Sequence, residues 1–189
     1  MKKYEFTGET KEIRLLFRTV TLHRIRATVA FGIVEVGDLG GWIEKEENLS
    51  HEGKAWVCGD AKVCGDAKVW GNAKVWGNAK VWGNAEVCGD AEVWGNAKVC
   101  GDAEVFSASH VLVIGAIGSR NDFTTFYRDK DNEITVKCGC FLGKIDRFLE
   151  KVTQTHGDSK YALVYRAAVE VAKLQIDLSG EAPKDADEE

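Results

Sequence analysis

A six-residue repeat fills the centre of the chain and restricts its fold more than any other feature. The unit is Ala-x-Val-x-Gly-(Asp/Asn), and its valines recur every six residues from Val57 to Val111. Ala-x-Val is typical of a short strand with one buried face, and Gly-(Asp/Asn) favours a corner because these residues adopt left-handed backbone easily. Corners this close together exclude hairpins of normal length. We therefore expect coils of three short strands and three corners, stacked in parallel through the backbone.

The fold class expected is mainly β, a parallel β-helix of about three coils with modules at both ends. We expect four parts: a β-rich N-terminal cap (1–52), the hexapeptide-repeat β-helix (53–114), a β-hairpin and two-helix module (115–177) and an acidic disordered tail (178–189). Strands are predicted in the cap at 3–7, 12–17, 21–29 and 33–36. The hairpin is predicted from 123–127 and 134–138, and the helices over about 144–154 and 158–176.

The repeated hexapeptides resemble the hexapeptide-repeat left-handed β-helix family, over about a third of the chain. The resemblance implies a left-handed coil and trimers of prisms packed side by side. Its most frequent implied activity is acyl transfer, with a histidine base near a loop that leaves the coil. Here the repeat runs from Ala55 to Val111 without an insertion, and His110, on an outward column, lies at its end. An acyltransferase is therefore kept as an alternative, and no catalytic residue, metal or cofactor is predicted.

Residues eighteen apart should stack in columns, which places Lys62, Lys80 and Lys98 together on one face. Stacked like charges are unfavourable unless water or an anion counters them. One interpretation is a solvated ladder that keeps the prism soluble. The other is a phosphate site in which Trp82, on the same face, stacks against a base. The sequence leaves both interpretations open.

The residue after each valine is apolar on all three faces, in columns of Trp, Cys, Phe or Leu. Monomers seldom expose contiguous apolar stripes of this size. We therefore expect the flanking modules or sister chains to cover them, and together with the family resemblance this predicts a homotrimer or a larger oligomer. The cysteines in these columns are expected to be reduced and to pack as small hydrophobes.

Two polar clusters follow the repeat, one at 119–124 and one at 156–161. They could serve only as an ion pair across a bend and as helix stops and caps. Alternatively, Arg120 and Arg128 bind a phosphate or carboxylate bidentately while Tyr127 stacks on a ring. The second interpretation completes the set of candidate ligand-binding residues: Lys62, Lys80, Lys98, Trp82, Arg120, Tyr127 and Arg128.

Charge and hydropathy limit the partners. The formal net charge of −5 is concentrated from Asp177 onward, so the body is formally neutral and lacks the cationic field of a DNA or RNA binder. No apolar stretch is long enough to span a membrane, and the N-terminus lacks the apolar core of a secretory signal. We expect a cytoplasmic protein, in the host cytoplasm if a phage encodes it.

The order of the modules, with Gly-Asp-Leu-Gly-Gly-Trp-Ile-Glu before the repeat and Cys-Gly-Cys-Phe after it, resembles small phage and prophage proteins. Some other phage proteins are oligomeric sponges for the nucleotide signals of bacterial immunity. By that analogy we expect a non-catalytic oligomeric binding protein that sequesters an anionic, nucleotide-like molecule, such as a cyclic nucleotide or an ADP-ribose derivative. A purely structural assembly protein is the first alternative, and a hexapeptide acyltransferase is the second.

Overall fold

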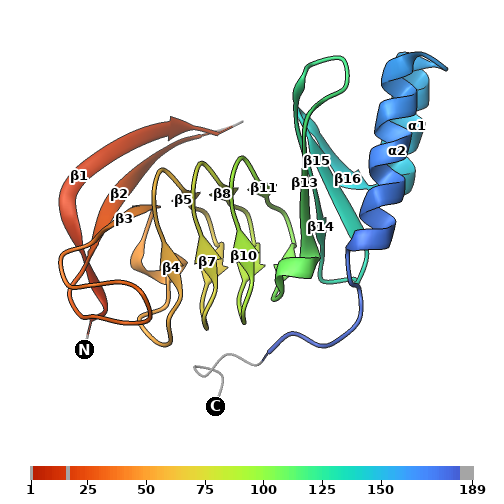
Figure 1. The fold of residues 1–189 in the computed structure, drawn as a ribbon. Helices are drawn as coiled ribbons and strands as arrows, with labels where there is room; N and C mark the ends of the chain where they lie inside the picture. Colours follow the sequence, from red (N-terminus) through yellow and green to blue (C-terminus); the bar gives the residue numbers. More distant parts are fainter. Residues whose placement is uncertain (1, 16–17, 184–189) are drawn as a thin grey trace.

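A computed structural model describes residues 2–15 and 18–183. The repeat forms a column of stacked coils, with the N-terminal strands at one end and a sheet and two helices at the other (Figure 1). The strands of the coils are two residues long: β4 Trp56–Val57, β5 Lys62–Val63, β6 Lys68–Val69, β7 Lys74–Val75, β8 Lys80–Val81, β9 Glu86–Val87, β10 Glu92–Val93, β11 Lys98–Val99 and β12 Glu104–Val105. Each strand from β4 to β9 pairs in parallel with the strand three positions later, which gives the solenoid three faces.

Alanine and valine fill the interior of the solenoid. Every repeat alanine from Ala55 to Ala103 and every valine from Val57 to Val105 is buried. The corner glycines have φ between +57° and +77°, where an L side chain is strained. At Gly83 a Cβ would also lie 2.9 Å from the Gly101 nitrogen of the next coil. The small repeat residues are therefore needed both for the narrow core and for the close stacking of corners.

The N-terminal residues close one end of the solenoid. Strands β1 (Tyr4–Arg14) and β2 (Thr19–Ala27) form an antiparallel pair, and β3 (Leu39–Ile43) joins β2 to β5. The bridge between Leu49 and Val69 begins another face. Strand β3 and Leu49 thus form a first turn that precedes the consensus repeat. With it, the solenoid has about four turns.

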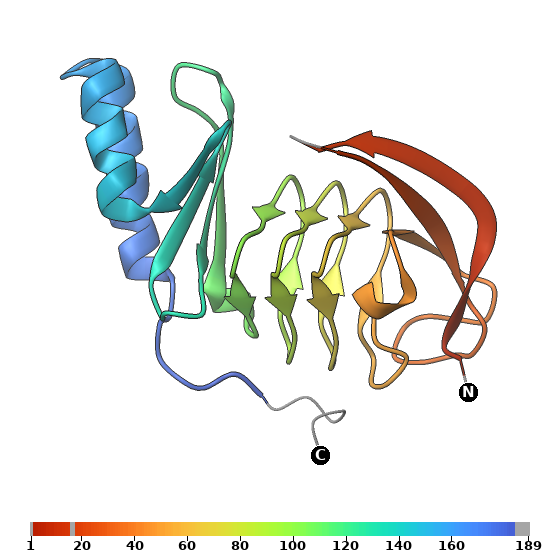
Figure 2. The same ribbon diagram turned by 180° about the vertical axis from the view of Figure 1, so that it is seen from behind.

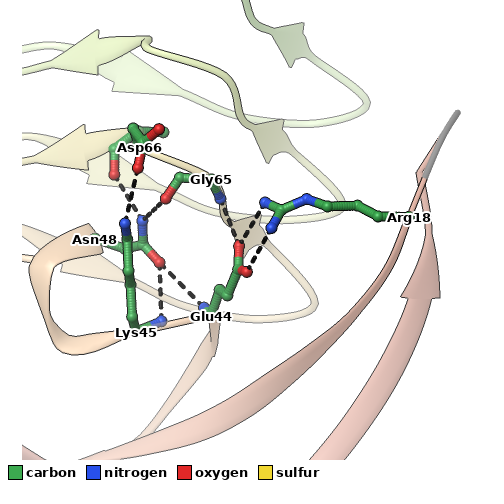
Figure 3. Close-up of polar contacts among 7 residues, drawn as sticks. Arg18, Glu44, Lys45, Asn48, Gly65 and Asp66 are labelled. Atoms are coloured by element: carbon green, nitrogen blue, oxygen red, sulfur yellow. Dashed lines mark hydrogen bonds and ion pairs between the residues drawn. The ribbon is translucent and has the colours of Figure 1, made fainter.

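Asn48, at the end of the 3-10 helix η1 (Glu46–Asn48), joins this first turn to the next coil (Figure 3). Its buried amide accepts from the Glu44 and Lys45 nitrogens at 3.2 and 3.0 Å. It donates to the Gly65 and Ala67 carbonyls at 3.0 and 2.8 Å. The side chain thus bonds four backbone groups at the point where the chain leaves β3, and only the Glu44 nitrogen among them also has a backbone partner, the Val63 carbonyl at 3.1 Å.

The C-terminal module is a four-stranded antiparallel sheet covered by two helices. After the 3-10 helix η2 (Ala108–His110), its elements are β13 Val111–Ile117, β14 Asp122–Arg128, β15 Ile134–Cys138, β16 Phe141–Lys144, α1 Ile145–His156 and α2 Lys160–Gln175. Apolar residues at helical spacing on α1 and α2 pack against the sheet. Figure 2 shows the segment after α2 turning back from the helices toward the coils.

A mainly β chain, a β-solenoid, a strand-rich N-terminal part and two C-terminal helices are confirmed. Several details differ from expectation. The strands predicted at 3–7 and 12–17 are one strand, β1, although residues 16–17 lie outside the described part. The stretch 33–36 contributes only a bridge between Phe31 and Val34. Strand β16 was not predicted, because its four residues follow a glycine turn and lack a clear alternation.

The end of the repeat and the tail also differ from expectation. The last valine of the pattern, Val111, begins β13, and His110 is buried in η2 instead of standing on an outward column. The Phe106 backbone nitrogen donates to Nδ1 of His110 at 3.3 Å. The predicted disordered tail is described only to residue 183, and its first part packs on the solenoid, with Pro183 beside Gly89.

Candidate functional site

The predicted lysine column exists, but most of its charge is countered. Lys62, Lys80 and Lys98 are paired in register on β5, β8 and β11. The buried Lys62 ammonium lies 2.8 Å from the Asp60 carboxylate, and that of Lys98 lies 3.7 Å from Asp122. Within residues 2–15 and 18–183, Lys80 has no carboxylate partner. One free ammonium is a weak basis for a phosphate site.

Asp60 lies between two ammonium groups on this face. Lys11, from β1, is 2.7 Å from the carboxylate, and Lys62 contacts it from the other side. Hydrogen bonds from Lys11 and Lys62 lower the pKa of Asp60 to about 2. Trp82, the predicted base-stacking residue, packs in a cluster that includes Trp42 and Cys64. This face is thus partly covered by the N-terminal strands of the same chain.

Two of the predicted ligand residues are structural, which corrects the interpretation of the first polar cluster. Tyr127 is fully buried in the core of the solenoid, and its hydroxyl donates to the Cys100 carbonyl at 2.9 Å. Arg128 is buried as well, 3.3 Å from the Glu104 carboxylate, and donates to the Gly180 carbonyl at 3.2 Å. Neither side chain is available to a ligand, because the sheet closes the end of the solenoid here.

Arg120 lies in a different place, and there the two polar clusters of the sequence meet. Ser119 Oγ and His156 Nε2 are 3.5 Å apart, although 37 positions separate them in the chain. The turn after β13 brings Ser119 to the end of α1. A cavity of about 410 Å³ opens beside them. Its lining residues are Ser119, Arg120, Cys138, Cys140, Phe141, Phe148, Lys151, Val152, Thr155, His156 and Tyr165. We name this cavity the basic pocket.

Glycines make the turns around the basic pocket possible. Gly118 has φ +73°, and a Cβ on it would collide with the Tyr165 hydroxyl. Gly139 has φ +55°, and a Cβ on it would collide with Nη1 of Arg120. The guanidinium of Arg120 therefore lies close to the backbone of the β15–β16 turn. This arrangement holds Arg120 at the rim of the pocket.

The interior of the basic pocket is aromatic. The rings of His156 and Tyr165 are stacked with centroids 5.8 Å apart, and the Tyr165 and Phe148 rings meet edge to face at 5.6 Å. Phe148 in turn contacts the half-buried Phe141 at 5.2 Å. Burial, followed by the proximity of Cys138, raises the pKa of Tyr165.

The pocket carries uncompensated positive charge. Arg120 and Lys151 both line it, and none of its described lining residues is Asp or Glu. In the described part of the chain neither cation pairs with a carboxylate. Two fixed positive charges over an apolar floor attract an anion. Lys151 was not among the predicted residues, although the helical period places it on the same side of α1 as Thr155.

The Ser119–His156 pair does not form a catalytic triad. A nucleophile and its base lie within about 2.6–3.2 Å, and a third group orients the base. Here the separation is 3.5 Å, and no carboxylate contacts His156 among the described residues. The pair is better explained as two hydrogen-bonding groups at the mouth of a binding site.

Comparison with known proteins assigns no family to the chain: no family model matches it, and no curated protein matches it. In the described ranges no cluster of His, Cys, Asp or Glu could hold a metal ion. No helix there is both long and apolar enough to cross a membrane. All six cysteines are free thiols.

Proposed function

We propose that the protein is a non-catalytic binding protein for an anionic, ring-bearing small molecule, and that it binds this molecule in the basic pocket. The observation that carries the proposal is the pairing of Arg120 and Lys151 over an aromatic floor without an acidic lining residue. The cavity volume of about 410 Å³ lies in the range of small-molecule sites.

The chemistry of the lining fits a nucleotide-like ligand. The planar guanidinium of Arg120 can bind two phosphate oxygens at once, and Lys151 adds a point charge. Ser119 and Thr155 can donate to further oxygens, and the half-buried ring of Phe141 offers a surface for a base. The predicted lysine column contributes less, because Lys62 and Lys98 already have acidic partners.

Sequestration is the role that this chemistry supports best, because binding alone is sufficient for it. We propose that the protein acts as an oligomeric sponge for a nucleotide signal, such as a cyclic nucleotide or an ADP-ribose derivative. An assembly protein is the second candidate. It is favoured by Trp76 and Trp94, which are 41% and 57% exposed on the β4–β7–β10 face.

Ligand recovery tests the proposal directly. Mass spectrometry of denatured protein should detect a co-purified anionic ligand, and calorimetry with a panel of nucleotides should identify one that binds. Heating should release that ligand intact, whereas a converted product would indicate an enzyme.

Charge removal locates the site. Arg120→Gln and Lys151→Gln each remove a charged hydrogen bond, so we expect binding to weaken about 10- to 150-fold per variant. Lys173→Gln is the matched control, because Lys173 lies on α2, pairs with Glu170 and does not line the pocket. Equal affinities for all three variants would refute the assignment to the basic pocket.

A further inference from the structure

A second and larger cavity lies on the β4–β7–β10 face of the solenoid, beside residues 31–34 of the N-terminal part. Its volume is about 600 Å³. The Phe31–Val34 bridge forms one side of the cavity. The cavity is lined by Phe31, Gly32, Ile33, Val34, Lys54, Trp56, Cys58, Asn72, Lys74, Trp76, Asp90 and Glu92. We name it the tryptophan groove.

The groove lies at the end of a ladder of indole rings. Trp76 and Trp94 occupy the same position in successive coils, and their rings stack with centroids 5.7 Å apart and planes 21° apart. The previous coil has Cys58 at this position, since Val57 pairs in register with Val75. One face of the Trp76 ring therefore lies against Trp94, and the opposite face is directed toward a small side chain. The groove is open at this interruption of the ladder.

The space suits a flat ring. Coils in a parallel stack are about 4.8 Å apart, and offset-stacked aromatic rings have centroids about 4.5–7 Å apart. A planar ligand placed over Cys58 would thus continue the spacing of the two indoles. Phe31 and Trp56, which meet edge to face at 5.4 Å, close the far side with further aromatic surface.

The polar edge of the groove is balanced in charge. Lys74 lies 3.2 Å from Glu92, and Asn72 donates to the Asp90 carboxylate at 3.0 Å. With Lys54, the formal charges of the lining sum to zero. Unlike the basic pocket, this groove therefore offers no electrostatic attraction for an anion. It offers donors and acceptors to the edge of a neutral ring.

We propose that the tryptophan groove binds an uncharged planar aromatic heterocycle, which stacks on the free face of Trp76 and hydrogen-bonds along the Asn72–Asp90 edge. This site is separate from the basic pocket and does not depend on the function proposed for it. Trp76 supplies the stacking surface. The small side chain of Cys58 supplies the room.

Titration with adenosine and with caffeine, followed by quenching of tryptophan fluorescence and by calorimetry, tests the proposal on the full chain. Cyclohexanol, which is apolar but not flat, is the matched control ligand. We expect the two heterocycles to bind and cyclohexanol not to bind. The variant Trp76→Ala should weaken heterocycle binding about 5- to 150-fold, the range for loss of one base–aromatic stack. Equal binding of all three ligands, or no binding, would overturn the proposal.

Two further variants separate the stack from a general loss of structure. Cys58→Trp should extend the indole ladder into the tryptophan groove and abolish binding. The circular dichroism and melting temperature should stay those of a folded chain. Trp94→Ala removes the indole on the other side of Trp76, so binding should persist. Binding that survives Cys58→Trp would refute the site. Light scattering that shows dissociation of an oligomer by Cys58→Trp, without ring binding to the native chain, would also refute it and would identify a protein interface.

Discussion

Replacement of Asn48 by alanine tests how the first turn of the solenoid is held. The Asn48 amide makes four hydrogen bonds to backbone groups and is fully buried (Figure 3). Alanine leaves the Lys45 N–H and the Gly65 and Ala67 carbonyls without these partners, whereas the Glu44 N–H keeps its 3.1 Å bond to the Val63 carbonyl. At about 1 kcal/mol net for each of the bonds lost without replacement, the expected loss of unfolding free energy is about 3 kcal/mol. For a chain of 150–250 residues this corresponds to a fall in melting temperature of about 6–12 °C.

Thermal unfolding followed by circular dichroism, together with urea titration, measures this loss. Asn84→Ala is the matched control, because the exposed Asn84 amide makes a single 3.0 Å bond to Asp102 on the solenoid surface. We expect it to cost no more than about 0.5 kcal/mol. If Asn48→Ala and Asn84→Ala destabilise equally, then the buried amide is not what joins the first turn to the coils, and the reasoning is refuted.

Three further predictions concern the corner glycines, the loss of stability at low pH and the β5–β8–β11 face that carries the lysine column. Gly83→Ala and Gly95→Ala both place alanine at positive φ, but only Gly83 would bring its Cβ to 2.9 Å from backbone, so urea titration should show the larger loss for Gly83→Ala; equal losses would show that backbone strain alone matters. The Asp60 pKa is lowered to about 2 in the folded chain, so its contribution is present above about pH 4 and is lost as the pH falls toward 2. Melting temperatures measured across this range should therefore decline less steeply in Asp60→Asn, and an unchanged slope would contradict this. The double variant Lys80→Glu, Trp82→Ala lies outside the basic pocket, so calorimetry should give it the same affinity for the nucleotide as the native chain. Lost binding with an intact fold would place the anion site on the β5–β8–β11 face.

The solenoid was predictable because each of its requirements is local. Alternating Ala and Val define a narrow buried strand, and each glycine corner already requires a positive φ before the next coil stacks on it. The stacking of Lys62 on Lys80 follows from the period alone. The first turn was less evident, because β3 and Leu49 join the coils without the consensus repeat.

The candidate site depended on contacts between segments far apart in the chain. Arg120, His156 and Lys151 come from a turn and a helix, and no periodicity relates them. Tyr127 and Arg128 appeared suited to a ligand because they are aromatic and basic, but the sheet buries both against the end of the solenoid. Residue type indicated the chemistry, and packing decided which side chains are free to perform it.

The apolar columns show the same division. The sequence by itself shows an apolar side chain after every repeat valine. The strand period places that position on the outer surface of the solenoid. Which of these columns remain open is a property of the tertiary structure. Flanking segments cover Cys64 and Cys100 on one face, whereas Trp76 and Trp94 stay exposed on another. The physical reason is that burial depends on what packs against a surface, and the strands, sheet and C-terminal segment that do so lie outside the repeat.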